Sequence, residues 1–183
     1  MIAGKRILAV IPARGGSKRA PRKNLRPFRG IPLLLWSQAA ALQSRYIDMV
    51  VCSTEDAEIK ALALKHMLTV IDRPAGLADD AATNEDVLRH VLYQLPDFDL
   101  VVLLQPTSPL RTADDIDACI QKAYHDDVGC ITYRENGTKN GAVYVAWASW
   151  IERGNSFSRP FRAFHIMPDE RSLDIDYPEQ FDA

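Results

Sequence analysis

The chain has 183 residues, of which 47% are hydrophobic and 25% charged, and its formal net charge is −2. These values are typical of one globular domain with a sizeable core. A nearly neutral chain is not expected to bind nucleic acid generally, because such proteins are usually basic. The apolar runs are too short to span a membrane, which takes about 20 residues. Three cysteines, Cys52, Cys119 and Cys130, form no CxxC motif, so we expect buried thiols in a cytoplasmic protein.

Apolar runs and helical segments alternate along the chain. The runs predict strands at 6–13, 48–54, 68–73, 98–106, 127–134 and 141–147. Helices are predicted at 32–44, 55–67, 84–95 and 112–126. Asn84 is the expected N-cap of the third helix, and Thr112 that of the fourth, with Asp115 three residues on. Residues 134–162 are the least regular part of the chain.

This alternation predicts βαβ units, and therefore a mostly parallel sheet with helices on both faces. In such folds, ligands bind beyond the carboxyl ends of the strands. Three polar loops, 13–30, 73–84 and 105–112, leave predicted strand ends. We therefore expect the functional site where these three loops meet.

The first loop carries a dense basic stretch, "IPARGGSKRAPRKN" at residues 11–24, which contains no acid. Gly15 and Gly16 allow a tight turn whose N–H groups form an anion nest. Arg14, Lys18 and Lys23 bring the charge that suits phosphate. The stretch is neither a Walker loop nor a GxGxxG fingerprint. The alternative is a solvated basic loop, but its position directly after the first buried strand favours an anion site.

Two further motifs bear on chemistry. In "QPTSPLR" (105–111), two prolines stiffen a loop that offers hydroxyl groups and an arginine, and the alternative is a rigid turn with a helix cap. In "SLDID" (172–176), an extended backbone would turn Asp174 and Asp176 to one side and Ile175 to the other. Two carboxylates suit Mg²⁺ beside phosphates, and the alternative is an edge strand with exposed acids. Together, the three motifs indicate metal-assisted nucleotidyl transfer.

The chain resembles the acylneuraminate cytidylyltransferases, which include the CMP-sialic acid synthetases and relatives for legionaminic or pseudaminic acid. The resemblance rests on "IPARGGSKRAPRKNL", "DRPAGLADDAATNEDVL", "LLQPTSPLRTADDID", "NGAVYV" and "SLDID", in this order. It implies a three-layer α/β/α, Rossmann-like nucleotide-diphospho-sugar transferase fold with a mostly parallel mixed sheet. It also implies that CTP and a nine-carbon 2-keto sugar acid react, with Mg²⁺, to give a CMP-sugar and pyrophosphate.

The resemblance also implies roles for individual residues. Arg14, Lys23 and Asp174 would be catalytic. The nucleotide would contact Ala13, Arg14, Gly15, Ser17, Lys18, Lys23, Asn24, Arg73 and Asn84. The sugar would contact Gln105, Thr107, Ser108, Arg111, Arg134 and Asn140. Asp174 and Asp176 would bind Mg²⁺, and the resemblance leaves open which of them, if either, is the general base.

In one segment the chain departs from the family pattern. Members of the family carry a longer stretch before "NGAVYV", which reaches a second subunit, whereas only "YRENGTKNG" is present here. The resemblance still implies a homodimer, with a single nucleotidyltransferase domain over 1–183 and a shortened or incomplete dimerisation and sugar-binding segment around 128–141. Two alternatives remain: a cytidylyltransferase for an eight-carbon sugar acid, and a nucleotide-binding module that no longer turns over.

Overall fold

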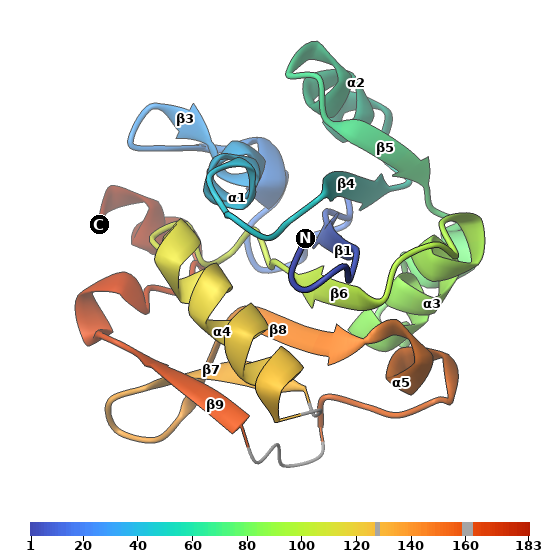
Figure 1. The fold of residues 1–183 in the computed structure, drawn as a ribbon. Coiled ribbons are helices and arrows are strands. Elements are labelled where there is room, and N and C mark those ends of the chain that lie inside the picture. The colour runs from blue at the N-terminus through green and yellow to red at the C-terminus, as the bar shows by residue number, and fades with distance from the viewer. Residues whose placement is uncertain (127–128, 159–162) are drawn as a thin grey trace.

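The computed structural model describes residues 1–126, 129–158 and 163–183. Within these ranges, seven strands form one mixed sheet in the order β5-β4-β1-β6-β8-β7-β9 (Figure 1). The strands are β1 (Ile7–Pro12), β4 (Met49–Thr54), β5 (Thr69–Asp72), β6 (Leu100–Leu103), β7 (Cys130–Arg134), β8 (Lys139–Trp147) and β9 (Ala163–Met167). A separate hairpin pairs β2 (Pro27–Phe28) with β3 (Ile31–Pro32). The expected α/β fold with a mostly parallel sheet is confirmed.

Helices cover both faces of the sheet. They are α1 (Leu33–Leu42), α2 (Ala57–Lys65), α3 (Asn84–Gln94), α4 (Ala113–His125) and α5 (Ala148–Glu152). Alternate residues of β1 point to opposite faces: Ile7, Ala9 and Ile11 pack into a core with α1, α2 and α4. Leu8 and Val10 pack into the core on the other face, with α3 and α5. The fold therefore has three layers.

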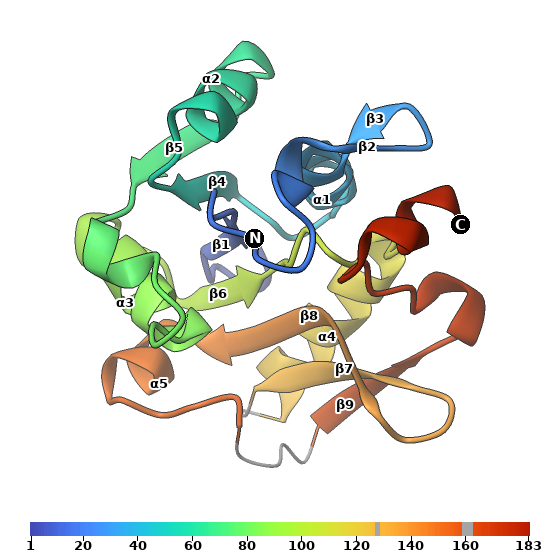
Figure 2. The same cartoon turned by 180° about the vertical axis from the view of Figure 1, so that it is seen from behind.

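The direction of the strands decides where the loops meet. Strands β1, β4, β5 and β6 run parallel. Strand β8 is antiparallel to both β6 and β7, and β9 is parallel to β7. The carboxyl ends of all strands except β8, together with the start of β8, therefore lie at one edge of the sheet. Figure 2 shows the loop after β1, the segment before α3 and the segment after β9 around this end of the fold.

Several element boundaries differ from the prediction. Thr83, not Asn84, is the N-cap of α3, because its side chain accepts the Asp86 amide in a capping box. Thr112 and Asp115 form the expected capping box of α4. The sequence patterns missed α5, β9 and the β2–β3 hairpin, and the first two lie in or border the region without regular periodicity. The predicted strand 127–134 begins at Cys130, and residues 127–128 lie outside the described part.

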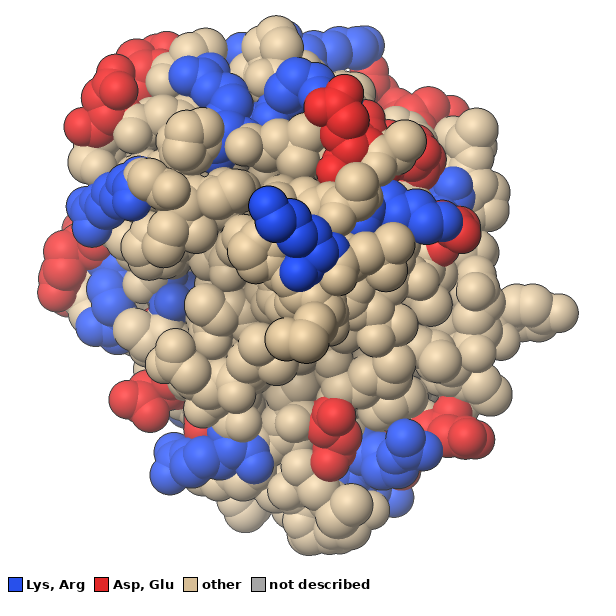
Figure 3. All heavy atoms as spheres, turned by 90° about the horizontal axis from the view of Figure 1, so that it is seen from above, with Lys and Arg blue, Asp and Glu red and all other residues tan. Residues whose placement is uncertain are grey.

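The surface is mixed in charge where it can be seen in Figure 3. Lys and Arg lie close to Asp and Glu around a largely uncharged centre, so that face has no broad area of one sign. All three cysteines are buried free thiols, as expected from their spacing. None of the helices in the described ranges is long and apolar enough to cross a membrane.

Candidate active site

An open cavity of about 770 Å³ lies at the edge of the sheet where the loops meet. Its walls come from the loop after β1, the segment 73–87, the start of the 105–111 loop, Ser156 and Ser158, and the segment after β9. The predicted site residues that line it are Arg14, Ser17, Lys18, Lys23, Asn24, Arg73, Asn84, Gln105, Thr107, Asp174 and Asp176. Residues from the three motifs therefore share one cavity.

The basic loop pairs with acids on the opposite wall. Arg14 donates hydrogen bonds to the carboxylate of Asp80 (2.9 Å) and to the backbone carbonyl of Asp79 (3.2 Å). Lys18 pairs with the other oxygen of the Asp80 carboxylate. These contacts hold the pKa of Asp80 below its usual value, the hydrogen bond from Lys18 contributing most. The Asp80 carboxylate thus occupies the position beside Arg14 and Lys18 that an anionic ligand would take.

A second ion-pair group lies deeper in the cavity. Lys23 donates to Asp176 over 3.0 Å, and Arg19 donates to the other oxygen of that carboxylate over 2.7 Å. The side chain of Lys23 is only 13% exposed, whereas that of Arg19 is 58% exposed. Because little water screens the Lys23 ammonium, it interacts more strongly with a nearby charge than the other lysine of the loop, Lys18, which is 80% exposed.

The Gly15 turn is shaped by close packing. An added Cβ on Gly15 would lie 2.3 Å from Oδ2 of Asp56, the N-cap of α2, whereas one on Gly16 would meet nothing within 4 Å. The Gly15 amide donates to the Glu55 carboxylate over 2.7 Å. Asn24 is buried, and its amide donates to the Arg14 carbonyl over 2.9 Å. The turn thus positions Arg14, although the Gly15 N–H of the expected anion nest is taken by Glu55.

The two acids of "SLDID" differ in their surroundings. Ile175 is buried against Phe28, Leu33 and other residues of a small core, so both neighbouring carboxylates face the cavity, as the alternation predicts. One carboxylate oxygen of Asp174, Oδ1, is buried without a hydrogen-bond partner. Burial raises the pKa of Asp174, and the Asp176 charge adds to the increase. A hydrogen bond from the Thr107 side chain opposes it, as do the charges of Lys23 and Arg134.

These two carboxylates are the candidate metal ligands of the cavity. Among the described residues, no three His, Cys, Asp or Glu side chains are grouped as a metal site. Mg²⁺ commonly takes one or two carboxylates together with phosphate oxygens and water. The uncommitted Asp174 oxygen beside Asp176 fits that donor set, with the remaining ligands supplied by the substrate.

Arg73 closes another part of the cavity. It is buried, and its guanidinium donates to the hydroxyl (3.2 Å) and the carbonyl (2.7 Å) of Ser53. Burial lowers the pKa of Arg73, and the nearby Arg14 lowers it slightly further. Asn84, the first residue of α3, lies on the same wall. Arg73 is therefore held by its bonds to β4, and Asn84 is placed by helix α3.

Six predicted site residues do not line the cavity. Ala13 is buried, and its amide donates to the Ser53 carbonyl over 3.0 Å. Gly15 lies behind the Arg14 turn, and Arg134 ends β7 outside the cavity lining. Ser108, Arg111 and Asn140 are all buried. None of these six residues lines the cavity, and the contacts with nucleotide or sugar expected of them stay predictions.

Arg111 shows why one of these side chains does not reach the cavity. Its guanidinium donates to the hydroxyl of Ser37 over 3.0 and 3.1 Å and also bonds the Gln105 carbonyl. Burial lowers the pKa of Arg111 to about 9. The Arg111 side chain therefore connects Ser37 of α1 to the backbone of Gln105, just after β6, from the interior of the protein.

Some cavity residues were missed by the sequence patterns. Ser156 and Ser158 come from the irregular region, and Glu85 holds this segment by accepting from the hydroxyl of Ser156 (2.8 Å) and the amide of Phe157 (2.6 Å). Asp80 lies in the quoted motif "DRPAGLADDAATNEDVL", but its pairing with Arg14 spans 66 positions. No local pattern signals contacts of that range.

Comparison with known proteins supports one reading of this cavity. The family model described as "Cytidylyltransferase" matches residues 8–145. The CMP-N,N'-diacetyllegionaminic acid synthase of Legionella pneumophila is 33% identical over 218 aligned positions, covering 94% of this chain and 92% of the relative. The N-acylneuraminate cytidylyltransferase of Escherichia coli O18:K1:H7 is 29% identical, covering 93% of this chain and 49% of the relative.

The alignment with the Legionella protein has 218 positions, more than the 183 residues of this chain, so that relative has residues without a counterpart here. Among solved structures, a CMP:2-keto-3-deoxy-manno-octonic acid synthetase complexed with CTP superposes with a TM-score of 0.81. It is 16% identical, with coverage of 97% of this chain and 96% of the other. At that identity the likeness concerns the fold alone.

Proposed function

The chain belongs to the cytidylyltransferase family, and we propose that it activates a nine-carbon 2-keto sugar acid, a nonulosonic acid, with CTP. The anomeric hydroxyl oxygen of the sugar bonds to the α-phosphorus, the bond to the β-phosphate oxygen breaks, and pyrophosphate leaves. The hydroxyl proton passes to a base. One observation carries the proposal: the basic loop and the Asp174–Asp176 pair line one cavity, where Lys23 pairs with Asp176.

The basic loop provides the binding site that we propose for the CTP phosphates. Arg14 and Lys18 now pair with Asp80, and Lys23 pairs with Asp176. A triphosphate that enters the cavity exchanges these carboxylates for phosphate oxygens, which bind arginine bidentately. Lys23 is the most shielded of these cations and opposes the charge that builds up on pyrophosphate as it leaves.

Asp174 and Asp176 are the residues that we propose hold Mg²⁺. Bound there, the ion would neutralise phosphate charge and help to orient the α-phosphorus. Asp174 offers an oxygen without a partner, whereas Asp176 must first exchange Lys23 and Arg19.

The remaining walls divide between base and sugar. We place cytosine against Arg73, which is bonded to Ser53 of β4, and against Asn84 at the start of α3. The sugar acid is placed against Gln105 and Thr107, with the segment of Ser156 opposite. The sugar acids named for the two relatives, diacetyllegionaminic acid and N-acylneuraminate, belong to one chemical class. The residues around Gln105 and Thr107 would therefore select among members of that class.

A substrate panel tests the proposal. The protein is incubated with CTP, Mg²⁺ and, separately, N-acetylneuraminic, legionaminic, pseudaminic and eight-carbon 2-keto acids, and pyrophosphate release is measured. We expect release with one or more nine-carbon acids, and its loss when EDTA removes Mg²⁺. Release with the eight-carbon acid alone would replace the proposed substrate. CTP binding without any release would identify a nucleotide-binding module.

We further propose that the protein is a cytoplasmic homodimer. The buried free thiols are typical of proteins from a reducing compartment. The dimer rests on the family resemblance, although the segment before "NGAVYV" is a closed hairpin here, in which the Arg134 amide donates to the Thr138 carbonyl over 2.8 Å. Sedimentation analysis tests this point, and a monomer at micromolar concentration would contradict it.

A further inference from the structure

The segment that carries Asp174 and Asp176 lies outside the sheet. After β9 the chain forms a short 3-10 turn, η3 (Asp169–Arg171), and then runs without regular structure through residue 176. In the described part of the chain, its Ile175 amide donates to the Thr107 carbonyl over 2.7 Å. The Gln180 side chain accepts from the Asp176 amide (2.6 Å) and donates to the Asp174 carbonyl (2.9 Å), and Ile175 is buried. Side-chain contacts further upstream determine where this stretch begins.

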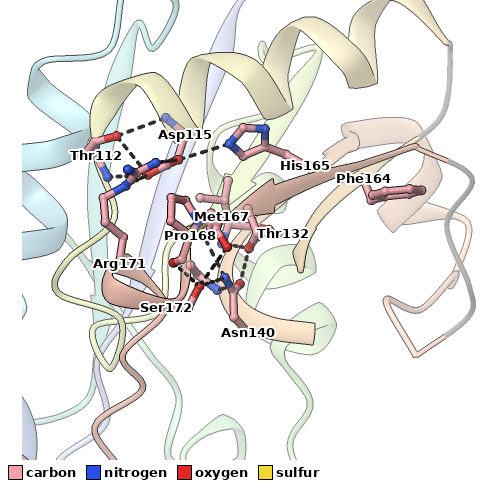
Figure 4. A network of polar contacts seen from close by, with 12 residues as sticks. Thr112, Asp115, Thr132, Asn140, Phe164, His165, Met167, Pro168, Arg171 and Ser172 are labelled. Atoms are coloured by element: carbon pink, nitrogen blue, oxygen red, sulfur yellow. Dashed lines mark hydrogen bonds and ion pairs between the residues drawn. The ribbon is translucent and has the colours of Figure 1, made fainter. Parts of the chain in front are cut away.

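One contact comes from helix α4. The buried carboxylate of Asp115 accepts from Arg171 over 2.8 Å at one oxygen and 3.3 Å at the other (Figure 4). It also bonds His165 over 3.1 Å and forms the capping box with Thr112. Asp115 thus joins the start of α4 to the middle of β9 and to the end of η3.

The second contact comes from β8. The side-chain amide nitrogen of Asn140 donates to the Ser172 hydroxyl over 3.0 Å, and Ser172 donates to the Pro168 carbonyl over 2.9 Å (Figure 4). The amide oxygen of Asn140 accepts from the Thr132 hydroxyl (2.6 Å) and from the Ala142 amide (3.1 Å). The Ala142 N–H can only donate, so the Asn140 atom that it contacts must be the amide oxygen. The amide nitrogen therefore faces Ser172.

An irregularity in the sheet brings Asn140 to this position. Tyr133 pairs with Lys139, and Ile131 pairs with Tyr144, so only Thr132 lies opposite the four residues 140–143 of β8. Gly141 takes a positive φ of 72°, and a Cβ on it would lie 2.8 Å from the side-chain oxygen of Gln105. The bulge therefore turns Asn140 inward toward Ser172 and packs Gly141 against Gln105, which lines the cavity.

We propose that Asn140 is a positioning residue, which acts through Ser172 to hold Asp174 and Asp176 in the geometry that binds a divalent cation beside CTP. Asn140 is 3% exposed and does not line the cavity, so it acts on the ligand only indirectly. Ser172 is two residues before Asp174, so its position is passed to the carboxylates through the backbone. Groups bonded directly to metal ligands change metal affinity by about 10- to 100-fold, and we expect the lower end of that range for this more distant contact. This inference rests on the proposed function.

The test compares Asn140→Asp and Ser172→Ala with a control from the same hairpin, Asn136→Asp. The first change replaces the donor that faces Ser172 by an acceptor at nearly equal volume, and the second removes the hydroxyl. Asn136 is exposed and accepts from the Thr138 amide through its side-chain oxygen, which aspartate retains. Thermal unfolding shows which variants fold, and Ser172→Ala serves if Asn140→Asp does not.

Two binding measurements separate positioning from general damage. CTP affinity is measured by calorimetry without metal, and Mn²⁺ binding to the CTP complex by electron paramagnetic resonance. We expect the two test variants to weaken Mn²⁺ binding about tenfold, to leave metal-free CTP affinity nearly unchanged, and the control to match wild type. Unchanged Mn²⁺ affinity in a folded test variant overturns the inference, as does an equal loss of metal-free CTP affinity.

The same measurements distinguish the inference from the proposed function. If the wild type binds Mn²⁺ with CTP but transfers cytidylyl to no sugar acid, a weakened variant still supports the role of Asn140. If the wild type turns over and the variants bind Mn²⁺ normally, the function stands and the positioning role is wrong. A wild-type CTP complex that binds no Mn²⁺ also overturns the inference.

Discussion

The Lys23 ammonium donates a 3.0 Å hydrogen bond to the carboxylate of Asp176, a residue 153 positions further along the chain. Both side chains are largely shielded, with 13% and 27% exposure. In the proposed reaction the lysine binds phosphate and the carboxylate binds metal. Each group therefore neutralises the other until phosphate and metal replace these contacts. As a result, neither charge is left unpaired at a partly buried position.

Replacing Lys23 tests its part in the chemical step. Lys23→Met should lower kcat by about 100-fold, because a preorganised cation is lost where charge builds up on the leaving group. CTP affinity should fall less, since Arg14 and Lys18 remain. Lys60→Met is the control, because Lys60 pairs with the exposed Asp72 away from the cavity. Single-turnover rates and CTP titrations measure the two effects, and an unchanged rate with weaker binding would assign Lys23 to binding alone.

Asp80 should compete with CTP for the basic loop. Asp80→Asn keeps the shape of the side chain and removes the charge that now pairs with Arg14 and Lys18. We expect a modest increase in CTP affinity, because exposed ion pairs are weak. The difference from wild type should shrink as salt is raised from low to 1 M, since salt screens the pair. Weaker CTP binding in the variant would show that Asp80 contacts the nucleotide directly.

The glycine pair provides a matched test of the turn. Gly15→Ala should destabilise the protein by about 1–2 kcal/mol, because the new methyl group displaces the Asp56 cap of α2. Asp56 cannot yield freely, because its carboxylate accepts the Glu58 and Ile59 amides at 2.9 Å each. Gly16→Ala meets no atom and should change stability much less. Urea denaturation compares the two, and equal losses would rule out the Asp56 clash as the cause.

Asp115 should make stability depend on acid pH. Hydrogen bonds from His165, Arg171 and Thr112 outweigh burial and hold the pKa of Asp115 well below its usual range. Its carboxylate therefore stabilises the fold fully above the unfolded pKa of about 3.9, and this contribution is lost as the pH falls through the lower, folded pKa. Asp115→Asn should thus be less stable than wild type at pH 7.

The same variant provides the pH comparison. The difference in unfolding free energy between wild type and Asp115→Asn should shrink when urea denaturation is repeated at pH 3, because wild-type Asp115 then begins to lose its advantage over the unfolded chain. A difference that stays constant between pH 7 and pH 3 would contradict the proposed protonation linkage. Asp169→Asn, at an exposed position of η3, is the control and should change neither value.

Local sequence was sufficient for six of the seven strands of the described sheet, for the layers and for many of the residues that share the cavity. Apolar alternation along β1 faces two cores, and the spacing of Asp174, Ile175 and Asp176 places one residue in a core and two in the cavity. The capping box of Thr112 and Asp115 is also local. These features depend on residues within a few positions of each other, and periodicity reports such relations directly.

Only the tertiary structure decided which polar side chains face the cavity and which support it from within. Arg111 and Asn140 look like ligand-binding residues in sequence, yet both are buried and hold neighbouring cavity segments. Asp115 holds Arg171 as well as capping its own helix. Polar residue types have the same hydrogen-bonding groups in either role, and the choice depends on partners that are distant in sequence. Local pattern carries no information about those partners, whereas folding brings them within hydrogen-bonding distance.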